Sequence, residues 1–264
     1  MTASLSSTLT TNFSGLATGI DTKALVAAIM AQESLGLNKL TAKETENTNK
    51  STIINSLKSG INTLNTSLAV LNDKLKTGDA TAITAAMQSV VNNFNAVQKI
   101  YNDNSSITKG SDGSIVKGPL ADDPTIKNLM SQMESDFRDS KNTATLAYSN
   151  PASIGIKTAA DGTLNLDTAT FQAALTNDPN AVKSIAGFTS LQTLLGSATA
   201  SNPDSALMRV QNGITMQNRT LDAEISSTQA RLAIRESMLN AQFSKMETVV
   251  AQMKASTGSL FNGA

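Results

Sequence analysis

The chain of 264 residues contains no cysteine, no histidine and no tryptophan, and aromatic residues make up only 3 % of it. Disulfide bonds, thiolate chemistry, histidine-based acid–base catalysis and most zinc sites are therefore excluded. The scarcity of large rings argues against a compact enzyme core, because such cores bury much of their apolar area in aromatic side chains. The apolar residues are mostly Ala, Leu, Ile, Val and Met, which suit packing between helices.

An excess of charge is also lacking, since 21 basic residues balance 21 acidic ones and no basic cluster stands out. We therefore expect no nucleic-acid partner and no membrane partner, because both would require a basic surface. No stretch is apolar enough to span a membrane. The first basic side chain is Lys23, so the N-terminus lacks the basic start and apolar centre of a secretory signal. If the protein leaves the cell, we expect export without a cleavable signal peptide.

Two helical seams dominate what is present. The first alternates by three and four residues, as a coiled-coil heptad does: Ile54, Leu57, Ile61, Leu64, Leu68, Leu71 and Leu75. The second lies in a segment from Asp204 to Ala255 that has no proline, which predicts one helix of roughly 75 Å. Its apolar residues are Ile214, Leu221, Ile225, Leu232, Leu239, Met246, Val249 and Met253. The simplest solution pairs the first seam with part of the second in an antiparallel coiled coil.

Shorter elements lie before and between these seams. Asp21 is expected to cap a helix that begins at Thr22, whereas residues 1–21 read as flexible and residues 41–51 as helix surface or a looser joint. Gly78 predicts a turn before a helix around residues 83–101, followed by a polar loop over residues 102–119. Asp123 and Pro124 predict the start of a third helix. Residues 152–167 predict a β-hairpin that turns at an Asp-Gly pair, and short helices follow it.

Patterns that could indicate catalysis are weak. Ser106 and Lys109 match S-x-x-K, and residues 76–78 match K-T-G, but their order is reversed relative to penicillin-binding enzymes and S-D-N is missing. Asp112-Gly113 and Asp161-Gly162 lack the further ligands of a calcium loop and are better read as turns. The sequence therefore predicts no catalytic residues, no metal site and no cofactor, and a loop-borne serine hydrolase at Ser106 is the alternative from a different class.

Three segments, taken in order, carry a family resemblance. Residues 14–22 (SGLATGIDT), followed by residues 30–33 (MAQE), are similar to the start of the flagellar filament cap family of hook-associated proteins. Residues 161–167 (DGTLNLD) and 178–182 (DPNAV) resemble its C-terminal region. Arg231, Leu232, Glu236, Phe243, Met246 and Met253, with residues 258–260, are also similar. One departure is plain: the family usually has a large β-rich region after the first seam, and here Leu75 passes almost directly into Ala80. Either that region has been removed, which we favour because the family pattern resumes at once, or the chain is a natural minimal form.

The resemblance implies a structural assembly protein, exported through the flagellar apparatus, that sits outside the cell at the filament tip and promotes flagellin folding and insertion. It implies a ring-shaped homo-oligomer, contacts with flagellin and an export chaperone before secretion. The expected fold is mostly α, with a long antiparallel coiled coil or bundle and a small module containing a β-hairpin. Other flagellar axial proteins and an unrelated coiled-coil adaptor remain alternatives.

We expect three regions: an N-terminal, partly flexible segment over residues 1–45, a helical core with the mixed module over residues 46–230, and a C-terminal helix and tail over residues 231–264. The residues expected to form the helical seam or to contact other subunits or the filament are Leu16, Ile20, Leu25, Ile29, Met30, Ile54, Leu57, Ile61, Leu64, Leu68, Ile225, Leu232, Leu239, Phe243, Met246 and Met253.

Overall fold

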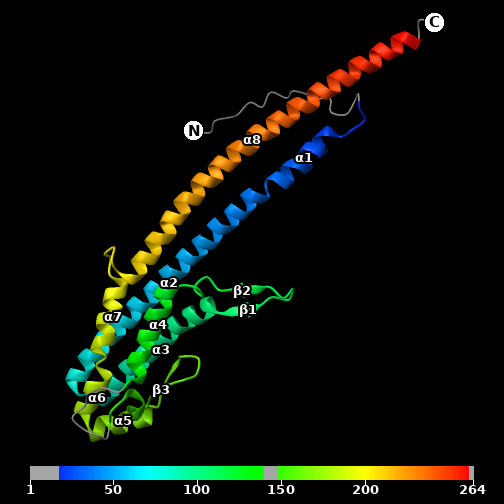
Figure 1. The fold of residues 1–264 in the computed structure, drawn as a ribbon. Helices are drawn as coiled ribbons and strands as arrows, with labels where there is room; N and C mark the ends of the chain where they lie inside the picture. Colours follow the sequence, from blue (N-terminus) through cyan, green and yellow to red (C-terminus); the bar gives the residue numbers. More distant parts are fainter. Residues whose placement is uncertain (1–17, 140–147, 262–264) are drawn as a thin grey trace. The chain divides into compact units, whose positions relative to one another are not determined.

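The protein is mostly helical, with two small antiparallel strand pairs (Figure 1). The computed structural model describes residues 18–139 and 148–261, so the predicted flexible segment up to residue 17 lies outside the described residues. The elements are α1 (Thr22–Glu33), α2 (Leu35–Thr77), α3 (Ala80–Ser105), β1 (Ile107–Lys109), β2 (Ile115–Lys117), α4 (Pro124–Arg138), the 3₁₀ turn η1 (Pro151–Ile154), β3 (Ile156–Thr158), β4 (Leu164–Leu166), α5 (Thr168–Asn177), α6 (Pro179–Ala186), α7 (Thr189–Thr199) and α8 (Ala206–Phe261).

The chain folds as two compact units. The first joins the described residues up to Glu44 with those from Arg219 onward, and the second is Thr45–Asn218. The long helices α2 and α8 each contribute residues to both. The predicted division after residues 45 and 230 stays a prediction.

The first unit pairs α1 and the first turns of α2 with α8, and Figure 1 shows α1 lying alongside α8. The pair is antiparallel. The Thr18 hydroxyl donates to the Glu247 carboxylate, and further along the N-terminal segment Arg235 Nε donates to Glu33 Oε1 at 3.0 Å. As predicted, Asp21 caps α1, and its Oδ1 accepts from the Ala24 amide at 2.9 Å.

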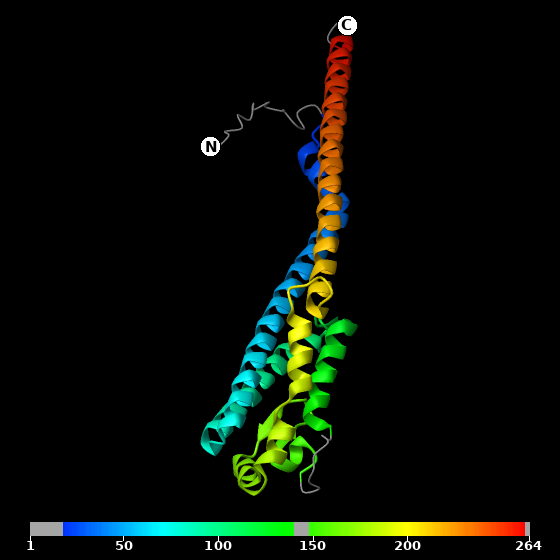
Figure 2. The same ribbon diagram turned by 90° about the vertical axis from the view of Figure 1, so that its left-hand side faces the viewer.

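The second unit holds the hydrophobic core. The first seam lies in α2, and all of its apolar residues from Ile54 to Leu75 are buried. The cluster around them includes Phe94 of α3, Phe137 of α4 and Leu195 of α7. Figure 2 shows α4 and α7 side by side in this bundle, as their contacts require. The predicted partner of the seam, the C-terminal helix, contributes only its first turns here, through Leu207 and Ile214.

Helix boundaries in this unit follow local sequence signals. Gly78 has a φ of +73°, a left-handed conformation that glycine adopts without strain, and it turns the chain between α2 and α3. Asp79 and Asp123 cap α3 and α4, where each carboxylate accepts from two backbone amides of the first turn. The polar stretch over residues 41–51, for which helix or joint was left open, is helical within α2.

The strands differ from expectation in one place. The hairpin β3–β4 forms with Ile156 opposite Leu166, as predicted. Residues 102–119, however, are not simply a loop: they continue α3 to Ser105 and then form the hairpin β1–β2, with Thr108 opposite Val116. The two strands were not predicted because each has only three residues and all of their side chains are exposed. Their sequences therefore show no alternation of buried and exposed residues.

The C-terminal helix is longer than predicted. α8 continues from Ala206 to Phe261, or about 84 Å at the rise of an α-helix. Gly213 does not interrupt it, because a glycine inside a helix costs only about 1 kcal/mol. The separate helix α7, between residues 189 and 199, was not predicted.

Candidate functional site

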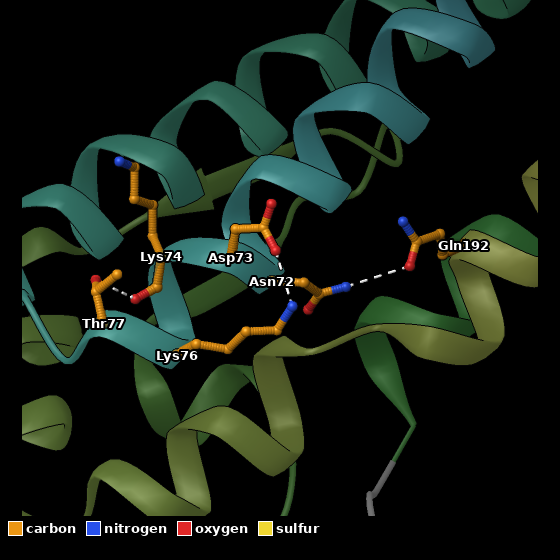
Figure 3. A network of polar contacts seen from close by, with 6 residues as sticks. All are labelled: Asn72, Asp73, Lys74, Lys76, Thr77 and Gln192. Carbon is orange, nitrogen blue, oxygen red and sulfur yellow. Dashed lines mark hydrogen bonds and ion pairs between the residues drawn. The ribbon is translucent and has the colours of Figure 1, made fainter.

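The residues that resembled catalytic motifs have structural roles. Residues 76–78 (KTG) form the end of α2: Lys76 Nζ donates to Asp73 Oδ1 at 2.8 Å, and the Thr77 hydroxyl donates to the Lys74 carbonyl at 2.7 Å (Figure 3). Beside them Asn72 Nδ2 donates to Gln192 Oε1 of α7 at 3.3 Å. The hydrogen bond and charge of Lys76 lower the pKa of Asp73. This network ends one helix and joins it to another.

Both Asp-Gly pairs are turns. Asp161 Oδ1 accepts from the Thr163 hydroxyl at 2.6 Å and from its amide at 3.0 Å, which lowers the pKa of Asp161. Asp112 makes the same two bonds to Ser114, with the same effect on its pKa. Within the described ranges, no group of three or more acidic side chains lies close enough to hold a metal ion. The carboxylates serve the turns.

The neighbouring carboxylates Asp122 and Asp123 are also separated in role. Asp123 is buried, caps α4 and forms an ion pair with Lys50 at 2.9 Å. Asp122 is exposed and pairs with Lys117 of β2 at 2.8 Å. Both line one cavity, where each carboxylate is paired with a different lysine.

The remaining candidate site is the helical pair of the first unit. Its seam on α8 is formed by Leu221 and Leu239, which are buried, and by half-buried residues at the intervening three- and four-residue steps: Ile225, Thr228, Leu232, Phe243, Met246 and Val250. On the N-terminal side Val26 is buried, and Ile29, Met30, Leu37 and Leu40 are half-buried. Leu40 shares a shallow depression with residues of α8 between Thr220 and Arg231, which extends the antiparallel register of this unit.

A second apolar strip lies on the outer side of the same α8 segment. Ile234 is 63 % exposed, Met238 is 49 % exposed and Val249 is 52 % exposed. At 100° per residue these three fall within about 60° of one another, on the side away from Leu232 and Phe243. On the N-terminal segment Ile20, Leu25 and Leu35 are also exposed. A helix with an apolar strip on two sides has one more surface than a single partner can cover.

The structure therefore divides those predicted site residues that it describes into three groups. Leu16 lies outside the described residues. Ile54, Leu57, Ile61, Leu64 and Leu68 are buried in the second unit, while Ile29, Met30, Ile225, Leu232, Leu239, Phe243 and Met246 line the inner seam of the first. Ile20, Leu25 and Met253 are exposed. Their roles in contacting other molecules stay predictions.

Two residues of the predicted seam lie outside it. Val249 and Met253 are exposed, and the seam continues through Val250 instead. Val249 is ten residues from Leu239, which places it about 80° around the helix. Met253 keeps the heptad spacing of the seam, but its side chain is 64 % exposed.

The sequence reading missed Ile234, Met238 and Leu35. A signal for the first two was present: residues 234, 238, 241, 245 and 249 repeat at steps of three and four, with Ala241 and the Lys245 stem completing the strip. The inner seam occupies the same stretch of sequence with the same spacing and more apolar residues, so the weaker pattern was overlooked.

Comparison with known proteins gives two matches. The model of a family described as flagellar hook-associated protein 2 C-terminus matches residues 37–255. The chain is also similar to the B-type flagellar hook-associated protein 2 of Pseudomonas aeruginosa, with 27 % identity over 179 residues. That alignment covers 66 % of this chain and 37 % of the relative, so the chain corresponds to little more than a third of that protein. No helix in the described part of the chain is long and apolar enough to cross a membrane.

Proposed function

Because this chain belongs to the flagellar hook-associated protein 2 family, with residues 37–255 matching its C-terminal part, we propose that it caps the tip of the flagellar filament. In this role it is a structural protein without catalytic activity, located outside the cell, and it promotes the folding and insertion of flagellin. The observation that carries the proposal beyond the family is the outer apolar strip of α8, which leaves a helical surface exposed for contact with other helices.

Helix-on-helix contact is the recognition mode that such a strip supports. An amphipathic helix binds a partner through apolar side chains at steps of three and four residues, and Ile234, Met238 and Val249 have this arrangement. Three of the exposed apolar positions on α8 are methionines, Met216, Met238 and Met253, whose flexible side chains adapt to more than one packing partner. A cap that must release and rebind as the filament grows needs contacts of this adaptable kind.

The partners we propose follow from this surface. One is a further copy of the chain, in a ring-shaped homo-oligomer, and the other is flagellin at the filament tip. Before export the same apolar strips would be covered by a flagellar export chaperone. The segments over residues 1–45 and 231–264 would serve as the terminal region that makes these contacts, and residues 46–230 as the helical core.

The inner seam and the outer strip make separable predictions. Leu239→Asp with Phe243→Asp places charges in the inner seam and is expected to unfold the helical pair of the first unit. Ile234→Asp with Met238→Asp places charges where both side chains are exposed, so the helix should persist while contact with partners is lost.

The test adds gold-labelled protein to cap-deficient flagellar filaments and images them by electron microscopy. We expect gold at distal tips with the parent chain, and none with the Ile234→Asp, Met238→Asp variant, whose helix content by circular dichroism is unchanged. Gold nowhere with the folded parent chain would refute tip capping by these helical parts and favour a coiled-coil adaptor. Equal tip labelling by the variant would refute the role of the outer strip.

A further inference from the structure

Two asparagines occupy matching levels of the α2–α8 pair in the second unit. Gln211 Nε2 of α8 donates to Asn55 Oδ1 of α2 at 2.9 Å, which shows that these two residues lie beside each other in the helix pair. Eight residues back along α2 is Asn47, and seven residues forward along α8 is Asn218. Both steps cover about 11–12 Å at the rise of an α-helix, so the two positions lie at about the same level along the helix pair. Asn47 also lines one cavity together with Gln217, next to Asn218.

The polar atoms that lack partners at these positions are complementary. Asn47 is 9 % exposed, and its side-chain Nδ2, a hydrogen-bond donor, is buried without a partner. The side-chain Oδ1 of Asn218, an acceptor, is likewise buried without a partner. Buried polar atoms are nearly always hydrogen-bonded, because an unpaired one has lost its bonds to water. A donor and an acceptor left over at the same level can satisfy each other by side-chain rotation alone.

Along the seam the neighbours of this pair are apolar, whereas the cavity beside it is lined by charged residues, among them Glu46, Lys50 and Arg209. Along α2 the next seam residue is Ile54, which is fully buried, and on α8 Ile214 is 5 % exposed. A single polar position in an otherwise apolar helical seam is known to specify register, because any other alignment leaves its polar atoms facing apolar side chains. A slip of seven residues would place Asn218 opposite Ile54 or Leu40.

We propose that Asn47 Nδ2 donates a hydrogen bond to Asn218 Oδ1 across the seam, and that this pair specifies the register in which α2 and α8 align. The pair is independent of the flagellar role. The pair provides specificity for one alignment of the two helices. Apolar packing alone does not provide it, since leucine and isoleucine side chains fit several alignments of a long helical pair.

A double-mutant cycle on the full chain tests the pair. Asn47→Leu and Asn218→Leu are made singly and together, and urea unfolding is followed by circular dichroism. Each single change leaves the other asparagine unpaired, so the two effects should not simply multiply. We expect the unfolding equilibrium constant of the double variant to be at least about fivefold smaller than the value obtained by multiplying the two single effects. Effects that multiply without coupling would overturn the proposal.

A matched control is Asn65, which lies on the same helix and also has a buried Oδ1 without a partner. Asn65→Leu combined with Asn218→Leu should show no coupling, because the two positions are far apart along the seam; coupling as large as that of Asn47 would overturn the assignment.

A second measurement does not depend on the stability of the leucine variants. In the parent chain, NMR should show slow hydrogen exchange of the Asn47 side-chain amide protons, and Asn218→Ala should accelerate it at least about fivefold. Rapid exchange in the parent chain, or no response to Asn218→Ala, would contradict the hydrogen bond.

Discussion

The aromatic stack in the second unit gives the most direct test of how this aromatic-poor chain is stabilised. Phe137 of α4 is 1 % exposed and lies between two other rings. Its centroid is 4.8 Å from that of Phe94 in α3, in an edge-to-face arrangement, and 4.6 Å from that of Phe188, which precedes α7. One side chain therefore joins three segments of the core.

Phe137→Ala should destabilise this unit by about 4 kcal/mol, the middle of the range for removing a buried phenylalanine. In a unit of this size, each kcal/mol lowers the melting temperature by about 2–4 °C, so the expected fall is about 8–16 °C. Phe137→Leu keeps most of the apolar volume but loses the ring contacts, and should cost roughly 1–2 kcal/mol.

Thermal unfolding followed by circular dichroism at 222 nm measures these changes. Val116→Ala is the matched control, because Val116 is 53 % exposed on β2 and its loss should change stability by no more than about 0.5 kcal/mol. A fall of less than about 3 °C for Phe137→Ala, or a fall as large for Val116→Ala, would refute the view that the ring stack anchors the core.

Two further predictions concern backbone conformation and pH. Gly155→Ala should destabilise the protein by about 1–3 kcal/mol, because Gly155 has a φ of +91° and a Cβ would lie 2.7 Å from the Asp167 carbonyl oxygen. Gly196→Ala, inside α7 with no atom within 4 Å of the added carbon, should instead stabilise it by about 0.5–1 kcal/mol. Denaturant titration measures both changes in unfolding free energy, and changes of the same sign would contradict the prediction. The melting temperature should be nearly constant from pH 6 to 9, because the chain has no histidine, and should fall in acid. Hydrogen bonds from Thr163 hold the pKa of Asp161 below its ordinary value of 3.8, so the stabilisation that they give the folded state is present above pH 3.8 and is lost as the pH falls through the lower folded-state pKa. A melting temperature that changed between pH 6 and 8 would contradict the predicted pH dependence.

Most helices of this fold could be predicted because their signals are local, whereas α7, whose preceding residue Phe188 makes no capping hydrogen bond, was not predicted. Asp21, Asp79 and Asp123 precede helices that they cap, and the seam from Ile54 to Leu75 has the spacing of one buried helix face. The hairpin β1–β2 could not be predicted in the same way. Its strands are three residues long and exposed on both sides, so neither burial nor alternation marks them in the sequence.

The partner of the first seam was predicted only in part. Periodicity shows which face of α2 is apolar, but it does not show which helices cover that face. In the structure residues of α3, α4 and α7 pack around it together with the first turns of α8. The outer strip of α8 was overlooked for a related reason: Ile234 and Met238 follow the same spacing as the inner seam, and only their exposure separates the two.

Site-specific photo-crosslinking tests whether the outer strip of α8 contacts other molecules at the filament tip. A photoreactive residue replaces Met238 on the strip or, as a control, Asn240, which is exposed but lies about 160° away around the helix. During filament growth we predict crosslinks from position 238 to flagellin or to a second copy of the chain, and few from position 240. Filaments that elongate with no crosslink from position 238, or with equal crosslinking from both positions, would contradict the proposed contact.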